Sequence, residues 1–108
     1  MSEFAGALRE RIIIERPVAL RTATGLQEAG FETVARCLAQ VEAEGVGAEA
    51  EGMALSAMGR FRITIRPRDE VKVGMRVRWG ARLLAIRQRI DNPRARDRLV
   101  LKCEEVRA

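Results

Sequence analysis

The residues of this sequence whose type and spacing could do chemistry are mainly arginines. Arg60, Arg62 and Arg66 share one parity, and Arg76 and Arg78 repeat that spacing farther along the chain. Alternate residues of a strand point to the same face, so each group forms a row of guanidinium groups. Guanidinium pairs bidentately with phosphate or carboxylate. The rows predict a basic face on two neighbouring strands, which contacts either a nucleic-acid backbone or an acidic protein. The alternative is a solvated face whose arginines pair with Asp and Glu.

The side chains that usually carry catalysis or bind metal are scarce in this sequence. There is no histidine, and Cys37 and Cys103 are too far apart for a CxxC zinc motif. Adjacent carboxylates, as in Asp69-Glu70 and Glu104-Glu105, point to opposite faces of a strand and form no acid–base couple. Gly45-Val46-Gly47 is not followed by a phosphate-loop pattern. We therefore predict a protein without enzymatic activity, with no catalytic residues, no cofactor and no metal.

Length and composition predict one globular domain over residues 1–108. Apolar residues make up 47% of the chain, which is enough for a core built mainly of aliphatic side chains. No apolar run reaches the roughly 18 residues of a membrane span. The first residues lack the basic and apolar pattern of a signal peptide. The two cysteines are expected to be free thiols in a reducing compartment, and a disulfide between them is the less favoured alternative.

The two halves of the chain carry opposite charge. Residues 1–59 hold five basic and nine acidic side chains, whereas residues 60–108 hold fifteen basic and six acidic ones. The cations of the second half are almost all Arg. Such a half is expected to face a polyanion or acidic partner surfaces, and two identical subunits could join their opposite halves head to tail.

Alternation of apolar and polar residues predicts strands along most of the chain. The segments with this pattern are Leu8–Leu20, Phe61–Ile65, Met75–Trp79, Leu83–Ile86 and Leu99–Cys103. Pro17 lacks a donor, which predicts an edge position and a bend in the first strand. Gly80-Ala81 predicts a tight hairpin turn.

Two stretches are ambiguous by sequence pattern alone. Phe31–Glu44 permits either a helix, by its alanines, or a strand, by its alternation. Ala48–Met58 permits a short helix weakened by Gly52, with a loop as the alternative. The sequence therefore predicts an all-β fold, a small antiparallel β-barrel or sandwich of about six strands, with one short helix or long loop inserted.

The order and spacing of three stretches resemble one known family. The stretches are Gly6–Glu15, with the pattern "L..RI.I"; Gly30–Glu44, ending in Val41-Glu42; and the run from Arg62-Ile63-Thr64-Ile65-Arg66 through Met75–Gly80 and Leu84-Ala85-Ile86 to Leu99–Glu105, ending in "CEE". Together they resemble the phage head-tail connector family. This family comprises head-tail adaptor, joining and head-closure stopper proteins of long-tailed phages and gene transfer agents.

The resemblance implies a β-barrel in which Phe31–Glu44 is a strand. It implies a structural neck protein, made in the bacterial cytoplasm, that forms a sixfold or twelvefold ring with other copies of itself. That ring is expected to join the portal and adaptor of the DNA-filled head to the tail terminator or tail tube. It is also expected to help close the DNA channel and to touch packaged DNA without reading its sequence. No membrane partner is expected.

Two loops are expected to reach the partners of such a ring or to cross its channel. Their residues are Arg21, Thr22, Ala23, Thr24 and Gly25 in the first loop, and Gly45, Gly47 and Gly52 in the second. The alternative function is a sequence-nonspecific nucleic-acid-binding β-barrel module that uses the arginine rows. A different ring component, similar to a tail terminator, is a further alternative.

Overall fold

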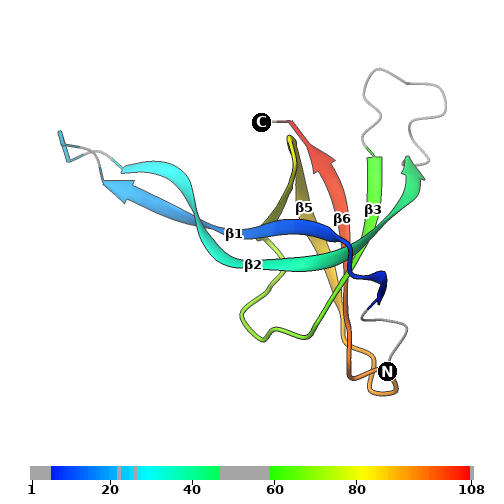
Figure 1. The fold of residues 1–108 in the computed structure, drawn as a ribbon. Coiled ribbons are helices and arrows are strands. Elements are labelled where there is room, and N and C mark those ends of the chain that lie inside the picture. Colours follow the sequence, from blue (N-terminus) through cyan, green and yellow to red (C-terminus); the bar gives the residue numbers. More distant parts are fainter. Residues whose placement is uncertain (1–5, 22, 26, 47–58, 108) are drawn as a thin grey trace.

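The computed structural model describes residues 6–21, 23–25, 27–46 and 59–107, and over these residues the fold is a closed antiparallel β-barrel (Figure 1). Its six strands are β1 (Glu10–Arg21), β2 (Gln27–Val46), β3 (Gly59–Ile65), β4 (Arg76–Trp79), β5 (Arg82–Ile90) and β6 (Leu99–Val106). Around the barrel they follow the order β1-β2-β3-β6-β5-β4, and β4 pairs with β1 to close it. The predicted all-β barrel of about six strands is confirmed. The predicted helix or long loop at 48–58 lies outside the described residues.

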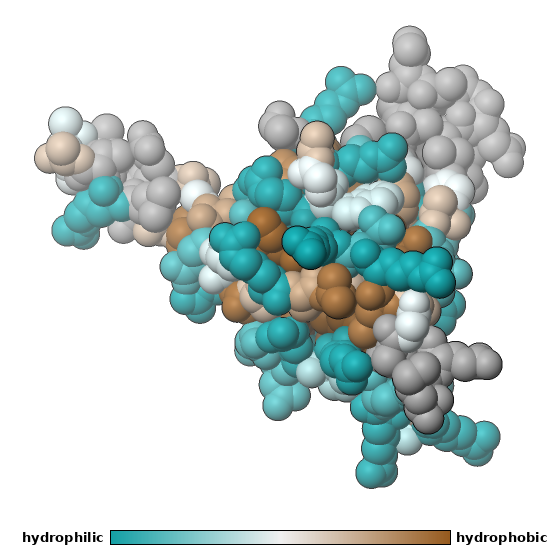
Figure 2. Space-filling view, in the orientation of Figure 1, coloured by the Kyte–Doolittle hydropathy of each residue, from teal (hydrophilic) through white to brown (hydrophobic). Residues whose placement is uncertain are grey.

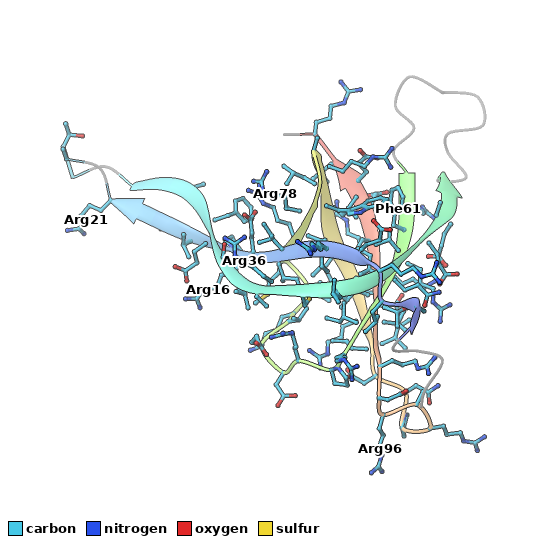
Figure 3. The ribbon with its side chains drawn as sticks, viewed as in Figure 1. Arg16, Arg21, Arg36, Phe61, Arg78 and Arg96 are labelled. Carbon is cyan, nitrogen blue, oxygen red and sulfur yellow. The ribbon has the colours of Figure 1, made fainter. Side chains whose placement is uncertain are left out.

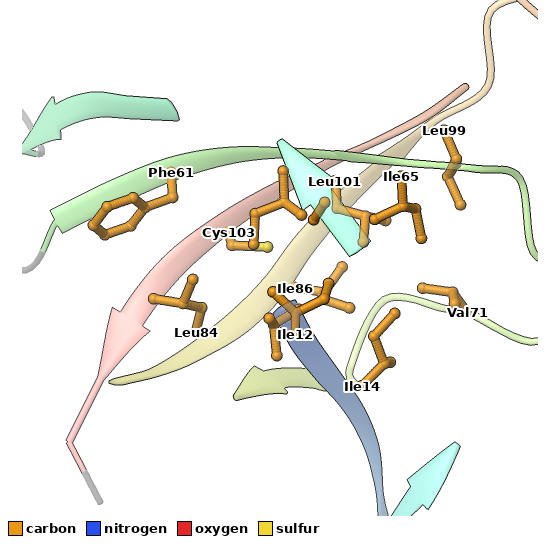
Figure 4. Packing of buried hydrophobic residues seen from close by; sticks show 13 residues of the cluster. Ile12, Ile14, Phe61, Ile65, Val71, Leu84, Ile86, Leu99, Leu101 and Cys103 are labelled. Carbon is orange, nitrogen blue, oxygen red and sulfur yellow. The ribbon is translucent and has the colours of Figure 1, made fainter. Parts of the chain in front are cut away.

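The barrel interior is filled by the apolar residues that alternate along each strand (Figure 4). Ile63 and Ile65 of β3 and Leu101 of β6 are fully buried, as is Ile14 of β1. Phe61 and Trp79 meet across the interior in an edge-to-face arrangement, with ring centroids 5.7 Å apart. Since burial of aliphatic side chains is the main favourable term in folding, this layer holds the barrel closed.

The strand prediction for Phe31–Glu44 is confirmed, and the helix alternative is wrong. The residues form the middle of β2, which pairs with β1 from Gln27 to Ala39 and with β3 from Gln40 onward. Ala35 and Ala39 are buried, because small side chains fit where β2 curves over the core. As a strand, this segment pairs with β1 and β3 and buries Ala35 and Ala39, and this tertiary context overrides the local helix propensity of its alanines.

β1 and β2 extend beyond the barrel as a two-stranded arm, formed by residues 16–21 and 27–33 (Figure 1). β1 pairs with β4 only from Ile13 to Glu15, so the rest of the hairpin has no neighbour on that side. The register between β1 and β2 shifts at Ile14/Glu15, which leaves Val34 as an extra residue on β2. Such a bulge bends a strand. The predicted edge position of Pro17 is confirmed, and the shift in register lies three residues earlier, at Ile14/Glu15.

The turn between β4 and β5 has the geometry that its sequence predicts. Gly80 has φ of 60°, whereas Ala81 has negative φ, which is the pattern of a two-residue turn with glycine at its first position. A side chain at position 80 would be strained in this backbone conformation. The predicted hairpin of β4 and β5 is therefore confirmed.

The connection between β3 and β4 closes one end of the barrel. Val71 in this connection is fully buried and packs into the core. Arg89 of β5 holds the connection in place by donating hydrogen bonds to the carbonyl oxygens of Arg68, at 2.9 Å, and Val71. Its other guanidinium nitrogens donate to both carboxylate oxygens of Asp91, at 2.9 and 3.1 Å. The hydrogen bond to Asp91 raises the pKa of Arg89, so the tether stays charged.

Cys37 and Cys103 are free thiols, as the sequence predicts. Burial of Cys103 in the core raises its pKa to about 12. Burial likewise raises the pKa of Cys37, against the smaller opposing effect of Arg68. Both sulfurs are therefore thiols at neutral pH and pack as small apolar groups. Among the described residues, no helix has the length and apolar character needed to cross a membrane.

Truncation of the buried layer should destabilise the barrel strongly. Leu101→Ala removes a fully buried side chain and should lower the free energy of unfolding by about 2–5 kcal/mol. The matched control is Leu38→Ala, because Leu38 is 48% exposed and its truncation should cost less than about 1 kcal/mol. Urea denaturation followed by the fluorescence of the single tryptophan measures both. Equal losses for the two variants would contradict this assignment of the core.

Candidate interaction surface

The predicted basic face is divided between two sides of the barrel. β3 pairs with β2 and β6, whereas β4 pairs with β5 and β1. The expectation that the strand of Arg60 and Arg62 neighbours that of Arg76 and Arg78 is therefore wrong. The reason is the connection between the two strands, which passes over the end of the barrel at Val71 instead of making a hairpin.

The first group of arginines lies on a surface of mixed charge. In the register of β3 and β6, Arg60 stands opposite Glu104 and Arg62 opposite Lys102. Lys102 Nζ donates to a carboxylate oxygen of Glu44 on β2, at 2.6 Å. Glu104 in turn pairs with Arg87 of β5, at 3.4 Å. Cations and anions are thus mixed on the outer surface of β2, β3, β6 and β5. Arg66 is exposed just beyond the end of β3.

The second group lies at the base of the arm, where β4 meets β1. Arg76 Nε donates to Glu15 Oε1 at 2.6 Å, and Arg78 Nε donates to Glu15 Oε2 at 3.4 Å. The guanidinium carbon of Arg76 also lies 3.5 Å from the ring centroid of Phe31, on the other strand of the arm. Arg76 therefore contacts both strands of the hairpin and braces the arm against the barrel.

Glu15 is ionised in this setting. Its side chain is only 12% exposed, and this burial by itself favours the neutral acid. The hydrogen bonds and charges of Arg76 and Arg78 outweigh burial and hold the pKa of Glu15 below its usual value of 4.5. The brace is therefore a charge-assisted contact at neutral pH.

A groove lies beside this brace on the outer surface of β1, β2 and β4. It is lined by Arg11, Ile12, Ile13, Arg36, Cys37, Leu38, Arg78 and Gly80. Ile13 stands opposite Arg36 of β2 on one side and Arg78 of β4 on the other. Figure 3 shows Arg36 and Arg78 at the base of the arm, with Arg21 near its tip and Arg96 at the far end of the barrel. We call this feature the basic groove.

Sequence reasoning missed two residues of the basic groove, Arg11 and Arg36. Both are exposed and alternate with the buried residues of their strands. The alternation of apolar and polar residues in β1 and β2 could therefore have shown that these two arginines face outward. Grouping them with Arg78 also requires the pairing of β1 with β4, between segments far apart in the sequence. No local pattern reveals that pairing.

The predicted interaction loops lie at separate places. Arg21, Ala23, Thr24 and Gly25 form the tip of the arm, where Gly25 takes φ of 85° at the turn. Thr22 lies outside the described residues. Gly45, with φ of 87°, lies near the end of β2, while Gly47 and Gly52 lie outside the described residues. The arm tip projects away from the barrel (Figure 1), so it can reach a neighbouring molecule.

The arrangement suits binding by contact. The described residues hold no group of three or more Cys, Asp or Glu side chains that could share a metal ion. The basic groove combines three guanidinium groups with the exposed side chain of Leu38, which is 48% accessible. Cations around an apolar centre are typical of a protein interface rather than of a reaction site.

Comparison with known proteins identifies similar chains. A family model described as phage head completion protein matches residues 5–106. The solution structure of a protein from Shigella flexneri 2a is similar, with 28% identity, a TM-score of 0.66, and coverage of 93% of this chain and 94% of that one. A chain of the virion of a native gene transfer agent particle has the same fold, with 21% identity, a TM-score of 0.71 and coverage of 94% and 97%. A search of curated protein sequences finds no significant match.

Removal of the Glu15 charge should weaken the barrel in a pH-dependent way. Glu15→Gln should lower the free energy of unfolding by about 1–3 kcal/mol at neutral pH, the usual effect of losing hydrogen bonds to a charged group. Because the folded-state pKa of Glu15 lies below 4.5, this contribution is present above pH 4.5 and is lost as the pH falls through the folded-state pKa. Urea denaturation of both proteins across this range measures the difference.

Glu32→Gln is the matched control for this experiment. Glu32 pairs with Arg16 on the arm, but the two side chains are 46% and 56% exposed. An exposed pair contributes about 0–1 kcal/mol. If Glu15→Gln lowered the free energy of unfolding no more than Glu32→Gln does, the contact of Glu15 with Arg76 and Arg78 would not stabilise the barrel.

Proposed function

The chain belongs to the family of phage head completion proteins, and from this membership we propose that it is a ring subunit that joins the DNA-filled head to the tail. The family model covers residues 5–106 of the 108, so nearly the whole chain carries the match. Membership makes the chain a structural component of the virion, and it confirms the resemblance to head-tail connector proteins. Ring formation, closure of the DNA channel and the individual partners are what we propose beyond it.

A ring subunit acts through the geometry of its contacts. Identical subunits that join by two different surfaces close into a ring when the rotation between neighbours permits it. The closed barrel offers paired strands around its circumference, whereas the arm has open edges along Arg16–Arg21 and along the first part of β2. Open edges are ready sites for contact with another chain. The arm is therefore our candidate for reaching a neighbouring copy, the portal and adaptor ring, or a tail terminator or tube protein.

The loops nominated from the sequence have roles in this proposal. One of the two segments nominated from the sequence, residues 21–25 and residues 45–52, helps to retain DNA in the channel, and the other contacts a neighbouring ring. Arginines near the channel contact phosphate without reading sequence. We propose that the protein works without catalysis in the neck of a phage or gene transfer agent particle, in sixfold or twelvefold symmetry.

Deletion of the gene from the producing strain tests this function. We expect particles whose heads fill with DNA but remain tailless or lose their DNA, because the connection between head and tail is missing. Electron cryomicroscopy of wild-type particles should show a ring of this barrel in the neck, and supplying the gene in trans should restore tailed particles. Normal particles from the deletion strain would contradict the proposal.

Binding to free DNA separates this proposal from the alternative of a nucleic-acid-binding module. Arg76 and Arg78 share the carboxylate of Glu15, and the surface around Arg60 and Arg62 is of mixed charge. We therefore expect weak binding to duplex DNA at physiological salt, within the nonspecific range of about 10⁻⁴–10⁻⁶ M. Fluorescence anisotropy with a labelled duplex over a salt series measures it. Tight binding with a steep salt dependence would favour the module.

A further inference from the structure

The face that holds the basic groove continues onto the arm, with apolar residues on both sides of one polar pair, and we call these apolar residues the strip. Ile13 and Leu38 lie in the groove. On this face the polar pair of Glu15 and Thr33 follows the groove, and the apolar pairs of Pro17 with Phe31 and of Ala19 with Ala29 lie beyond it. Phe31 is 40% exposed and Leu38 48% exposed. Figure 2 shows apolar side chains bordered by hydrophilic ones on the side of the molecule where β1 and β2 lie in front. Partly exposed apolar side chains that gather on one face, with polar groups around them, are typical of a contact surface.

The cations around the strip exceed the anions. Arg11, Arg36, Arg76 and Arg78 lie on this face, and Glu15 is the carboxylate that pairs with the last two. Within the described part of the chain, neither Arg11 nor Arg36 has a hydrogen-bond or ion-pair partner. The strip therefore offers two guanidinium groups whose full hydrogen-bonding capacity is available to a partner.

Charge and polarity decide among the possible occupants. The same face of a second copy would bring its arginines against these arginines, which like-charge repulsion disfavours. The outer surface of β3 and β6 in a second copy is of mixed charge, because Arg60, Arg62 and Lys102 lie beside Glu104, so it offers these arginines no continuous acidic surface. A DNA backbone would satisfy the arginines, but it would leave Leu38, Ile13 and Phe31 without apolar contacts.

We propose that this face binds an acidic segment with aliphatic or aromatic side chains, belonging to a different protein of the virion. The proposal rests on the proposed function, and it adds the surface and the chemistry of the partner. The apolar side chains of that segment pack on Leu38, Ile13 and Phe31. Its carboxylates pair with Arg11 and Arg36, which can bind them bidentately.

In such an interface the apolar groups and the charged groups contribute in different ways. Aromatic and aliphatic contacts at the centre of an interface usually supply most of the affinity. The surrounding charges chiefly set the rate and the specificity of association. The brace of Glu15 and Arg76 holds the arm in line with the groove, so the strip is already formed before the partner arrives.

Photocrosslinking within purified particles identifies the occupant. Leu38 is replaced with p-benzoylphenylalanine, particles are irradiated, and the crosslinked peptides are sequenced by mass spectrometry. We expect a crosslink to one other virion protein, within a segment that contains both carboxylates and apolar residues. Val73, which is 57% exposed in the connection between β3 and β4, is the control position and should not crosslink to that segment. Crosslinks only to a second copy, only to DNA, or to nothing would overturn the proposal.

Charge reversal tests the arginines independently. Arg36→Glu and Arg11→Glu should each reduce the yield of tailed particles at least about tenfold, the effect of losing one charge-assisted contact. Arg94→Glu is the matched control, because Arg94 is an exposed arginine in the loop between β5 and β6 and its reversal should leave the yield unchanged. Thermal unfolding of each purified variant confirms that the barrel is intact. Full yield from both groove variants would overturn the proposal.

The two proposals fail in different ways. If particles lack the chain altogether, or form normally without its gene, the proposed function is lost. If the chain occupies the neck but position 38 crosslinks elsewhere, the proposed function stands and only the assignment of this face fails.

Discussion

The short pairing of β1 with β4 is the contact on which the rest of this structure depends. It joins Ile13, Ile14 and Glu15 to Arg78, Val77 and Arg76, and these three residue pairs are fewer than those of any other strand pair described in the barrel. Three residue pairs supply few ladder hydrogen bonds, so side chains must reinforce the closure. Ile14 and Val77 do so inside the barrel, where both are fully buried. The Glu15 carboxylate does so outside, by pairing with both arginines.

The same contact determines where the interaction features lie. β1 has 12 residues and β2 has 20, whereas β4 has only four. The barrel can pair only a part of the long hairpin, and the remainder must project as the arm. The bulge at Ile14/Glu15 marks the point where the arm leaves the barrel. An isolated two-stranded hairpin is marginally stable in water. Arg76, in contact with Glu15 and with the ring of Phe31, compensates for this weakness at the base of the arm.

Sequence pattern predicted the parts of the fold that depend on neighbouring residues. The alternation in Phe61–Ile65 and in Leu99–Cys103 corresponds to β3 and β6, because one face of each strand packs into the core. The β4–β5 turn followed from Gly80. Alternation does not say which strands are neighbours. β3 and β4 are consecutive in the chain but apart in the barrel, since Val71 is drawn into the core between them. The predicted arginine face was divided for this reason, and the basic groove was not foreseen.

The opposite charges of the two halves pair largely within the folded chain. An acidic first half and a basic second half could join two subunits, but much of this complementarity is used within one chain. Glu15 of β1 binds Arg76 and Arg78 of β4, and Glu44 of β2 binds Lys102 of β6. These contacts join early strands to late ones across the barrel. The cations that remain without such partners in the groove, Arg11 and Arg36, come from the acidic half itself. The opposite net charges of the two halves therefore reflect ion pairs that form within the folded chain. The candidate interaction surface is built instead from arginines that these ion pairs leave without a partner.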